Sequence, residues 1–316
     1  MAQARPRIVF FGSGAFGVPT LERIVGRYEV ALVVSQPDRP AGRGKTLTPT
    51  PVAARAVELG LEVVKPEDVN APEVVARIRG LGASAWVVIA FGQKLSKELL
   101  DGVFAINLHG SLLPAYRGAA PIQRAVMDGC AVTGVSVISL AERMDAGLVY
   151  ATRSRAVGAE ETSDEVHDAL ARLGVEAVEE VLAAHAAGAA RGVAQDESRA
   201  TRARKLAKHE GTIDLAARPA AAARAWINGL NSWPGCTVLV GGVPLKLLRV
   251  REVSAEGLGA PGALHGDGRV RCADGAVELL AVQPLGGKPM EVAALLRGRP
   301  ALVGARVEPL AAPAAG

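Results

Sequence analysis

Cysteine is scarce in this chain. Its 316 residues include only three cysteines, which stand far apart at Cys130, Cys236 and Cys272. An odd, scattered set of this kind favours neither a disulfide framework nor a cysteine-based metal site, and it suits a reducing compartment. We therefore expect a cytoplasmic protein that holds no metal.

Long apolar runs and a strong net charge are also lacking. No stretch approaches the ~18 uncharged apolar residues of a membrane-spanning helix, and the apolar run before Gly12 is too short for a signal-peptide core. We expect neither secretion nor membrane association. A content of 49% hydrophobic and 22% charged residues excludes a largely disordered chain, and the length allows two domains.

The net charge of +4 is small, but one connecting segment carries a net excess of four basic residues. Residues 191–208 hold six lysines and arginines against two acids. Such a segment is typical of proteins that bind a polyanion, because basic side chains that neutralise phosphates release counterions. A solvated linker would have the same composition, so both interpretations stay open here.

A glycine-rich turn follows the first expected strand. Residues 12–17 read GSGAFG directly after the apolar stretch Arg7–Phe11. This G-x-G-x-x-G spacing is typical of dinucleotide sites, but the expected acid is missing from the end of the second strand, and Asp38 falls inside a loop. The pattern favours a tight strand-to-helix turn over an NAD site. A dehydrogenase would rest on this motif alone.

Apolar strands and amphipathic helices alternate through the first part of the chain. This pattern predicts an α/β domain with a Rossmann-like, mostly parallel sheet. Short strands between glycine-rich turns after residue 208 predict a C-terminal OB-like β-barrel. The expected strands of the first part are 7–11, 30–34, 62–64, 85–90, one that starts at residue 105, 133–140 and 148–153, with helices over 51–59, 72–79, 119–129 and 163–187. We expect a catalytic domain over 1–190, a basic linker over 191–208 and the barrel domain over 209–316.

The loop at residues 35–50 is long and cationic. It contains three prolines and two glycines and carries Arg39, Arg43 and Lys45 against the single acid Asp38. Loops of this length usually have a function, so we expect an arm that contacts phosphates. A mobile surface connection is the alternative.

Polar residues gather after the expected strand in the sequence AINLHGSLLPAYRG, residues 105–118. Successive side chains of a strand alternate in direction, so Asn107 and His109 project to the same side. Gly110 allows a sharp turn, and Ser111, Tyr116 and Arg117 add polar groups around it. Phe91-Gly92 follows a neighbouring strand, and ligands of parallel sheets bind at such strand ends. We expect the active site here.

These residue types suit acyl transfer through a tetrahedral intermediate. The amide of Asn107 can donate to an oxyanion, and His109 can either move a proton or stabilise that oxyanion as a cation. Asp145, in the turn ERMDAG, would orient the imidazole. Ser111 lacks the elbow of a nucleophilic serine, and no cysteine has a histidine nearby in sequence. Direct attack by an amine of the substrate is the simpler mechanism.

The segment NLHGSLLPAYRGAAPIQRAVMDG, residues 107–129, closely resembles the core of the methionyl-tRNA formyltransferase family. The loop QPDRPAGRGK, the D-x-G at residues 145–147, the linker KLAKHEGTID and the turn NSWPG extend the resemblance over nearly the whole chain. It implies a formyltransferase catalytic domain and an OB-like domain. The implied reaction transfers formyl from 10-formyltetrahydrofolate to the α-amino group of methionyl initiator tRNA, for translation initiation.

The resemblance also implies roles for single residues. The family's catalytic Asn, His and Asp fall on Asn107, His109 and Asp145. The implied folate contacts are Phe91, Gly92, Ser111, Leu112, Leu113 and Pro114. The implied tRNA contacts are Arg39, Arg43, Lys45, Lys205 and Lys208. We expect a monomer that uses neither metal nor NAD.

Some positions depart from the family pattern. The GSGAFG turn lacks the usual Thr-Pro pair, and residues 93–97, QKLSK, lack a proline on the folate side. Leu215 and Ser232 replace a usual tryptophan and a usual proline. Two alternatives remain: a formyltransferase for a ribosylamine or an amino sugar, and a non-catalytic RNA-binding protein. The basic segments and the barrel favour tRNA over the first, and the polar strand end disfavours the second.

Overall fold

The computed structural model describes residues 5–41, 44 and 46–310, and it divides into two compact units. The first unit combines residues up to Arg117 with Gly134–Ser154 and His167–Arg202. The second combines Gly118–Thr133, Arg155–Val166 and the chain from Ala203 onward. Each unit therefore contains three separate stretches of sequence.

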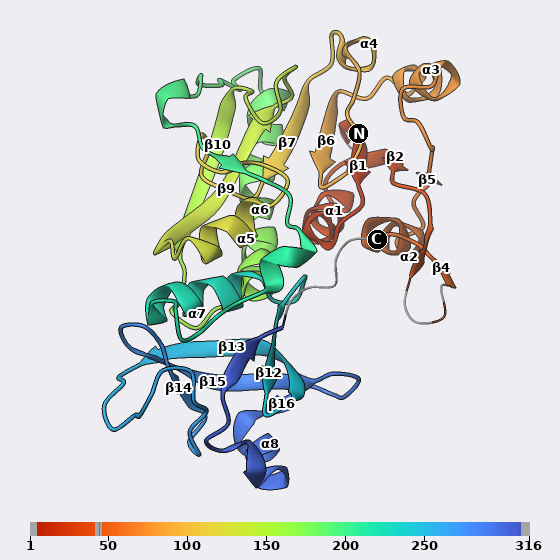
Figure 1. Ribbon diagram of the computed structural model, residues 1–316. Helices are drawn as coiled ribbons and strands as arrows, with labels where there is room; N and C mark the ends of the chain where they lie inside the picture. Colours follow the sequence, from red (N-terminus) through yellow and green to blue (C-terminus); the bar gives the residue numbers. More distant parts are fainter. Residues whose placement is uncertain (1–4, 42–43, 45, 311–316) are drawn as a thin grey trace. The chain divides into compact units, whose positions relative to one another are not determined.

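The first unit is built on a seven-stranded sheet (Figure 1). Neighbouring strands are parallel from β7 to β5, whereas β9 runs antiparallel to β7. This arrangement confirms the predicted Rossmann-like, mostly parallel sheet. The strands in spatial order are β10 (Val149–Ala156), β9 (Val132–Ser139), β7 (Ala105–His109), β6 (Ala85–Ile89), β1 (Arg7–Gly12), β2 (Glu29–Val34) and β5 (Val63–Val64).

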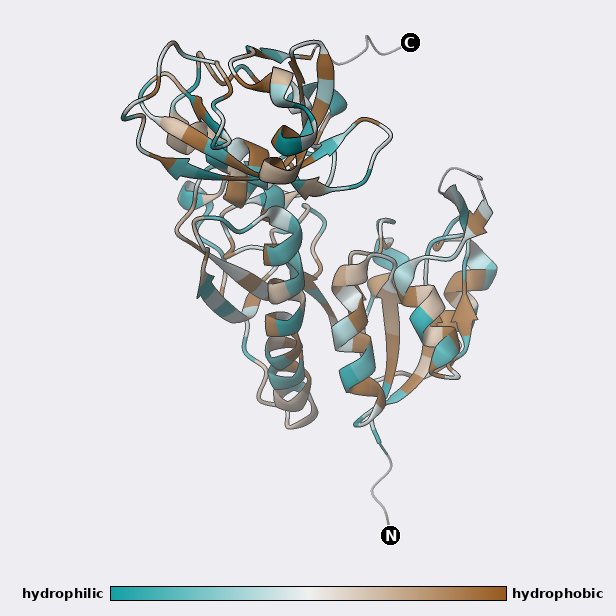
Figure 2. Ribbon diagram, turned by 90° about the horizontal axis from the view of Figure 1, so that it is seen from below, coloured by the Kyte–Doolittle hydropathy of each residue, from teal (hydrophilic) through white to brown (hydrophobic). Residues whose placement is uncertain are grey.

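Helices cover both faces of this sheet. On one face Val9, Phe11 and Trp86 pack with Ile78 of α3 (Pro72–Gly80) and Leu99 of α4 (Lys97–Leu100). The other face is covered by α1 (Val18–Val25), α2 (Pro51–Glu58) and α6 (Ser163–Ala186). Figure 2 shows hydrophobic strands in the sheet and helices that carry both hydrophobic and hydrophilic residues. The strands thus read as apolar runs because both of their faces are buried.

The glycines of the GSGAFG turn allow close packing. After β1 the chain forms a short 3₁₀ helix, Ala15–Gly17, and continues into α1. A Cβ atom at Gly12 would lie 2.7 Å from the Phe10 ring, and one at Gly17 would lie 3.3 Å from Val52 Cγ2. The turn therefore needs glycine for contact between this helix and the sheet, which gives the motif a structural reason.

The segment expected to be an open loop, residues 35–50, contains a hairpin instead. Strands β3 (Arg39–Ala41) and β4 (Thr46–Thr48) pair antiparallel, and Thr50 Oγ1 accepts a hydrogen bond from Ala53 N at 3.1 Å to cap α2. Alternation of apolar residues is weak in this polar sequence, so its pairing gave no signal. Arg43 and Lys45 lie outside the described residues.

A curled antiparallel sheet forms most of the second unit (Figure 1). Residues 262–264 join its two edges: Gly262 N donates to Arg271 O at 2.9 Å, and Val307 N donates to Gly262 O at 2.7 Å. This closure confirms the predicted OB-like barrel. The strands in order are β14 (Arg269–Arg271), β15 (Ala276–Pro284), β13 (Val243–Val253), β12 (Cys236–Val240) and β17 (Val307–Pro309), and β16 (Met290–Glu291) pairs with β15.

Helices complete the core of the second unit. Met127 of α5 (Pro121–Met127) and Ile227 of α7 (Ala220–Gly229) share one apolar cluster with the barrel strands. Leu296 of α8 (Val292–Gly298) joins the same cluster. The remaining short elements are β8 (Arg117–Gly118), β11 (Arg202–Ala203) and the 3₁₀ turns Glu197–Arg199, Lys208–Gly211 and Pro300–Leu302.

Two kinds of feature are absent from the described residues. Across residues 5–41, 44 and 46–310 no helix has the length and apolar character to cross a bilayer. Over the same part of the chain no three or more His, Cys, Asp or Glu side chains gather into a metal-binding group.

Candidate active site

The carboxyl ends of the five parallel strands share one edge of the sheet. At this edge Gly14 N donates to Ala90 O at 3.2 Å, and Ser13 Oγ donates to Phe91 O at 2.9 Å. The loops after β1 and β6 are therefore tied together beside the end of β7. Open parallel sheets bind ligands at such an edge, where helix N-termini and loops converge.

Asn107 and His109 occupy alternate positions of β7 and face the same side of the sheet. Ala105, two positions earlier, packs in the cluster with Trp86 on that face, so the polar pair continues the face beyond its apolar core. Asn107 is half-buried, and its side chain has no hydrogen-bond partner among the described residues. Its amide is thus available to an added group.

His109 is nearly buried, and both of its ring nitrogens face oxygen atoms. Its Nε2 lies 2.9 Å from Tyr116 O, and its Nδ1 lies 3.7 Å from Asp145 Oδ2. A carbonyl oxygen can only accept, so Nε2 must carry a proton. Nδ1 faces the carboxylate of Asp145, so the two contacts together set the orientation of the ring.

Asp145 lies in the tight turn between β9 and β10. Its φ angle is +54°, a left-handed conformation that residues with a Cβ adopt infrequently. The side chain is 11% exposed and points toward His109. Two residues later a Cβ atom at Gly147 would overlap Ser139 O, so this position requires glycine. The turn therefore holds the carboxylate at the end of β7.

Three further side chains meet behind this turn. Gln195 donates to the carbonyl of Asp145, and the buried Arg117 donates both to Gln195 and to Glu197. The hydrogen bonds from Arg117 and then Arg143 lower the pKa of Glu197 to about 2. Sequence reasoning missed Gln195, because nothing distinguishes a lone glutamine in a polar segment.

The residues expected to contact folate line the same edge, with different exposures. Phe91 is buried against Phe11, whereas Gly92 is exposed and has a φ of +90°. Ser111 is fully buried and donates to Ala115 O at 2.6 Å, so its hydroxyl stabilises the loop. Leu113 is buried, and Leu112 and Pro114 are half-buried. Only the backbone and the apolar side chains here are left to contact a ligand.

Three of the residues expected to contact tRNA, Arg39, Lys205 and Lys208, are described, and all three are exposed. Arg39 lies on β3 and pairs with Glu67 at 2.8 Å, with both side chains well exposed. Lys205 and Lys208 are also exposed, the latter at the start of a 3₁₀ turn. Exposed ion pairs contribute little to stability, so Arg39 can exchange Glu67 for another anion at small cost.

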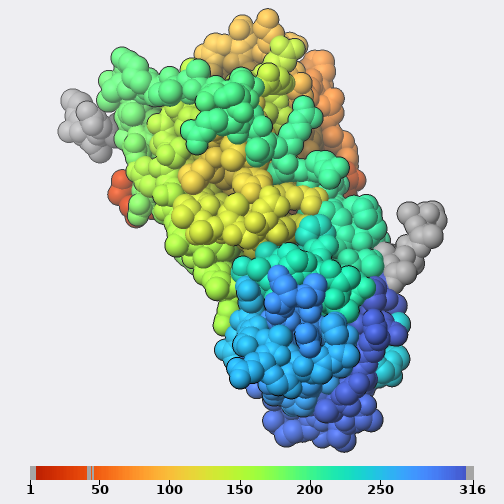
Figure 3. All heavy atoms as spheres, turned by 60° about the vertical axis from the view of Figure 1, so that its left-hand side comes forward, coloured from red at the N-terminus to blue at the C-terminus, as the bar shows by residue number. Residues whose placement is uncertain are grey.

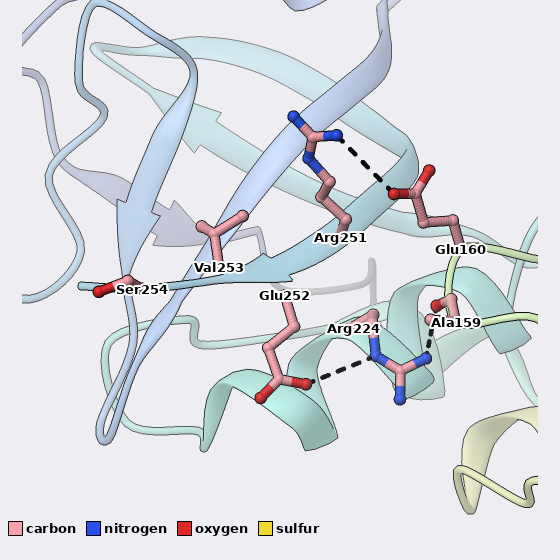
Figure 4. Close-up of a pocket in the computed structure, with 7 residues that line it drawn as sticks. All are labelled: Ala159, Glu160, Arg224, Arg251, Glu252, Val253 and Ser254. Carbon is pink, nitrogen blue, oxygen red and sulfur yellow. Dashed lines mark hydrogen bonds and ion pairs between the residues drawn. The ribbon is translucent and has the colours of Figure 1, made fainter. Parts of the chain in front are cut away.

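A hollow of about 560 Å³ lies in the second unit, and Figure 4 shows the charged side chains around it. Arg251 pairs with Glu278 at 2.8 Å and lies 3.9 Å from Glu160. Arg224 donates to Ala159 O at 2.6 Å and lies 3.8 Å from Glu252. Each arginine is thus already neutralised by carboxylates of its own unit, and none of the predicted site residues lines this hollow.

Two of the three cysteines are unsuited to nucleophilic chemistry. Burial raises the pKa of Cys236 to about 12 and that of Cys272 to about 11. Both thiols stay protonated at neutral pH, and the thiolate is the nucleophile.

Comparison with known families matches both parts of the chain. The formyl transferase family matches residues 6–182. The formyl transferase C-terminal domain family matches residues 205–300. The two matches leave only residues 183–204 uncovered between them.

Curated relatives match over nearly the full length. The methionyl-tRNA formyltransferase of Cereibacter sphaeroides strain KD131 is 42% identical over 305 residues, which cover 95% of this chain and 98% of that protein. The methionyl-tRNA formyltransferase of Heliobacterium modesticaldum is 44% identical over 310 residues, covering 93% and 97%.

Solved structures share the fold at much lower identity. HypX from Aquifex aeolicus in complex with tetrahydrofolic acid has a TM-score of 0.65 and 17% identity, covering 93% of this chain and 47% of that one. The sugar 3N-formyl transferase WlaRD has a TM-score of 0.66 and 12% identity, covering 90% and 99%. At these identities the likeness concerns the fold alone.

Proposed function

Since this chain belongs to the methionyl-tRNA formyltransferase family, it formylates methionyl-tRNA, and we propose that Asn107, His109 and Asp145 carry that reaction. The chain uses 10-formyltetrahydrofolate, which supplies the formyl group and whose departing nitrogen takes up the proton that the methionine amine gives up. The observation that carries the proposal is the convergence of an available amide, an imidazole and a carboxylate at one strand end.

Each side chain then has a separate task. Asn107 donates a hydrogen bond to the formyl oxygen as that oxygen gains negative charge during attack by the amine. His109 lies beside it and either moves a proton or stabilises the oxyanion, with its two ring nitrogens facing Tyr116 O and Asp145. Asp145 holds the imidazole in that orientation. No covalent bond to the protein is needed.

We propose that the loop Ser111–Pro114 and Phe91-Gly92 form the surface that binds folate. Gly92 offers exposed backbone groups at the strand-end edge, and the half-buried Leu112 and Pro114 offer apolar surface to a flat ring. Ser111 contributes by holding the loop through Ala115.

Basic residues outside this edge are our proposed tRNA contacts, with initiator tRNA as the substrate. Arg39, together with Arg43 and Lys45, would contact phosphates from the hairpin region, and Lys205 and Lys208 would do so from the linker. We also propose that the functional division follows residues 1–190, 191–208 and 209–316, and that the enzyme is a cytoplasmic monomer.

Formylation of methionyl-tRNA by single-residue variants tests the catalytic assignment. The variant His109→Ala should lower kcat by about two orders of magnitude or more, and Asn107→Ala should lower it about 100-fold or more, with the affinity for tRNA little changed. His265→Ala, in a turn of the second unit, is the matched control and should keep full activity. Wild-type turnover by His109→Ala would contradict the proposal.

A further inference from the structure

Residues 195–201, which we call the clasp, contact two segments beside His109 and Asp145. These are the loop after β7 and the turn between β9 and β10. The clasp falls between the two family matches, which end at residue 182 and begin at residue 205, and its sequence predicts a linker. In Figure 3 green residues lie on the surface of the first unit, beside yellow-green residues. The clasp belongs to the unit that carries His109 and Asp145, although five of its seven residues are exposed.

Gln195 stabilises the turn that contains Asp145 through hydrogen bonds to its backbone. Its Nε2 donates to Asp145 O and to Gly147 O, each at 2.8 Å. One amide therefore fixes the backbone on both sides of Ala146. Asp145 has its φ of +54°, and residues with a Cβ remain in this region only where surrounding contacts hold them.

Arg117 fixes the direction in which that amide points. Its Nε and Nη2 donate to Gln195 Oε1 at 3.0 and 2.7 Å, so the amide nitrogen must face the turn. The guanidinium is buried and also donates to both carboxylate oxygens of Glu197 at 2.9 and 3.1 Å. Arg143 binds Glu197 from the other side.

Thr201 holds the other partner of the catalytic histidine. Its Oγ1 accepts from Tyr116 N at 2.8 Å, and its carbonyl accepts from Arg117 N at 2.9 Å. Tyr116 has a φ of +60°, and its own carbonyl accepts from His109 Nε2 at 2.9 Å. The conformation that aims this carbonyl at the imidazole is therefore fixed by Thr201.

We propose that Gln195 and Thr201 are positioning residues for formyl transfer. Gln195 places the carboxylate of Asp145, and Thr201 places the carbonyl that orients His109. His109 lies at the end of β7 and Asp145 in the turn after β9, and the clasp sets the 3.7 Å distance between His109 Nδ1 and Asp145 Oδ2. This inference rests on the proposed catalytic roles of His109 and Asp145.

Gln195→Glu tests the first half, because it keeps the acceptor for Arg117 and removes the donor to both carbonyls. A misplaced catalytic group typically costs about 10- to 100-fold in rate. We expect kcat to fall by that factor while KM for folate and for methionyl-tRNA stays within about twofold. Gln283→Glu, whose amide donates to Gly287 O in a hairpin of the second unit, is the matched control.

Thr201→Val and Thr201→Ser test the second half. Valine matches threonine in shape and lacks the hydroxyl, so kcat should fall by about 10-fold. Serine restores the acceptor for Tyr116 N and should recover most of the activity.

The pH profile separates positioning from loss of folded protein. In Gln195→Glu and Thr201→Val the pH dependence of kcat should move, because the distance between His109 and Asp145 changes. A structural defect would lower the amount of active enzyme at every pH by the same factor. Activity per folded molecule, with folding followed by circular dichroism, that equals wild type at all pH values would overturn the proposal.

His109→Ala and Asp145→Asn distinguish failure of the proposed catalytic roles from failure of the proposed role of the clasp. If both retain wild-type kcat, the proposed catalytic roles fail. If both lose activity while Gln195→Glu and Thr201→Val keep the wild-type kcat and pH profile, only the clasp fails. When the clasp acts through Asp145, Gln195→Glu adds little further loss to Asp145→Asn.

Discussion

Glu197 shows how one exposed carboxylate can act on a buried site. Its side chain is 55% exposed, yet it forms ion pairs with both the nearly buried Arg117 and Arg143. A buried arginine without an anionic partner would be strongly disfavoured. The carboxylate therefore matters for where Arg117 lies, and Arg117 in turn orients Gln195.

The pKa of Glu197 gives a prediction for the pH dependence of stability. Its folded-state pKa is lowered from 4.5 to about 2 by Arg117 and Arg143. The stabilisation is therefore complete above pH 4.5 and disappears as the pH falls from there through about 2. Urea unfolding of wild type and Glu197→Gln should differ at pH 7 and differ less at pH 3.

Glu256→Gln is the control for this pH series, since Glu256 is exposed in a turn of the second unit. Its difference from wild type should be small at both pH values. A Glu197→Gln difference that grew on acidification would contradict the assigned direction of the pKa shift.

At the scale of single residues, the sequence predicted the side chains of the site better than the groups that hydrogen-bond to them and position them. The period of two along residues 105–109 placed Asn107 and His109 on one side, as the structure has them. Asp145 came from the resemblance and from its polar turn. The carbonyl of Tyr116 and the amide of Gln195 could not be predicted, because one is a backbone group and the other acts across 50 residues of sequence.

Helix α6 approaches the sheet closely where β7 carries the site. A Cβ atom at Gly174, in the middle of α6, would overlap the Leu108 side chain, next to His109 on β7. The glycine therefore sets the distance between this helix and the strand. Close packing leaves the Leu108 side chain little room to move aside.

Gly174→Ala should lower the free energy of unfolding by about 1–3 kcal/mol, because the added methyl group overpacks the contact with Leu108. Gly80→Ala, at the end of α3 with no heavy atom within 4 Å of the added Cβ, should leave stability unchanged or slightly higher. Thermal and urea unfolding measure both. Equal stability of Gly174→Ala and wild type would mean that α6 can move away from β7.

Elements with a strong local signal were predicted closely. The helix expected over 163–187 is observed as Ser163–Ala186, and its capping box is present: Thr162 N donates to Glu165 Oε2 at 2.9 Å, and Glu165 N to Thr162 Oγ1 at 3.4 Å. Helices α4 and α8 and the hairpin of β3 and β4 were missed. They are short, and their pairing or burial depends on distant residues that periodicity does not report.

The lysines of the linker predict how the binding of tRNA by the whole molecule responds to salt. Each lysine that contacts a phosphate contributes about one unit to the slope of log affinity against log salt. The double variant Lys205→Gln, Lys208→Gln should therefore have a slope smaller by about two units, with kcat at saturating tRNA little changed. KM for methionyl-tRNA between about 50 and 200 mM salt measures it.

Lys288→Gln is the control for the salt series, because Lys288 is an exposed lysine of a hairpin in the second unit. It should keep the wild-type slope. If the double variant also kept that slope, the linker lysines would not contact phosphates during binding.

Each unit is assembled from separate stretches of sequence, and this has a consequence for synthesis on the ribosome. Helix α5, within Gly118–Thr133, shares its core with residues that begin at Leu206 and continue to Val307. Its apolar residues are therefore made long before their partners, and at about 5–20 residues per second the delay is on the order of ten seconds. The nascent chain would display this helix without its core over that time, which makes it a natural target for a ribosome-associated chaperone.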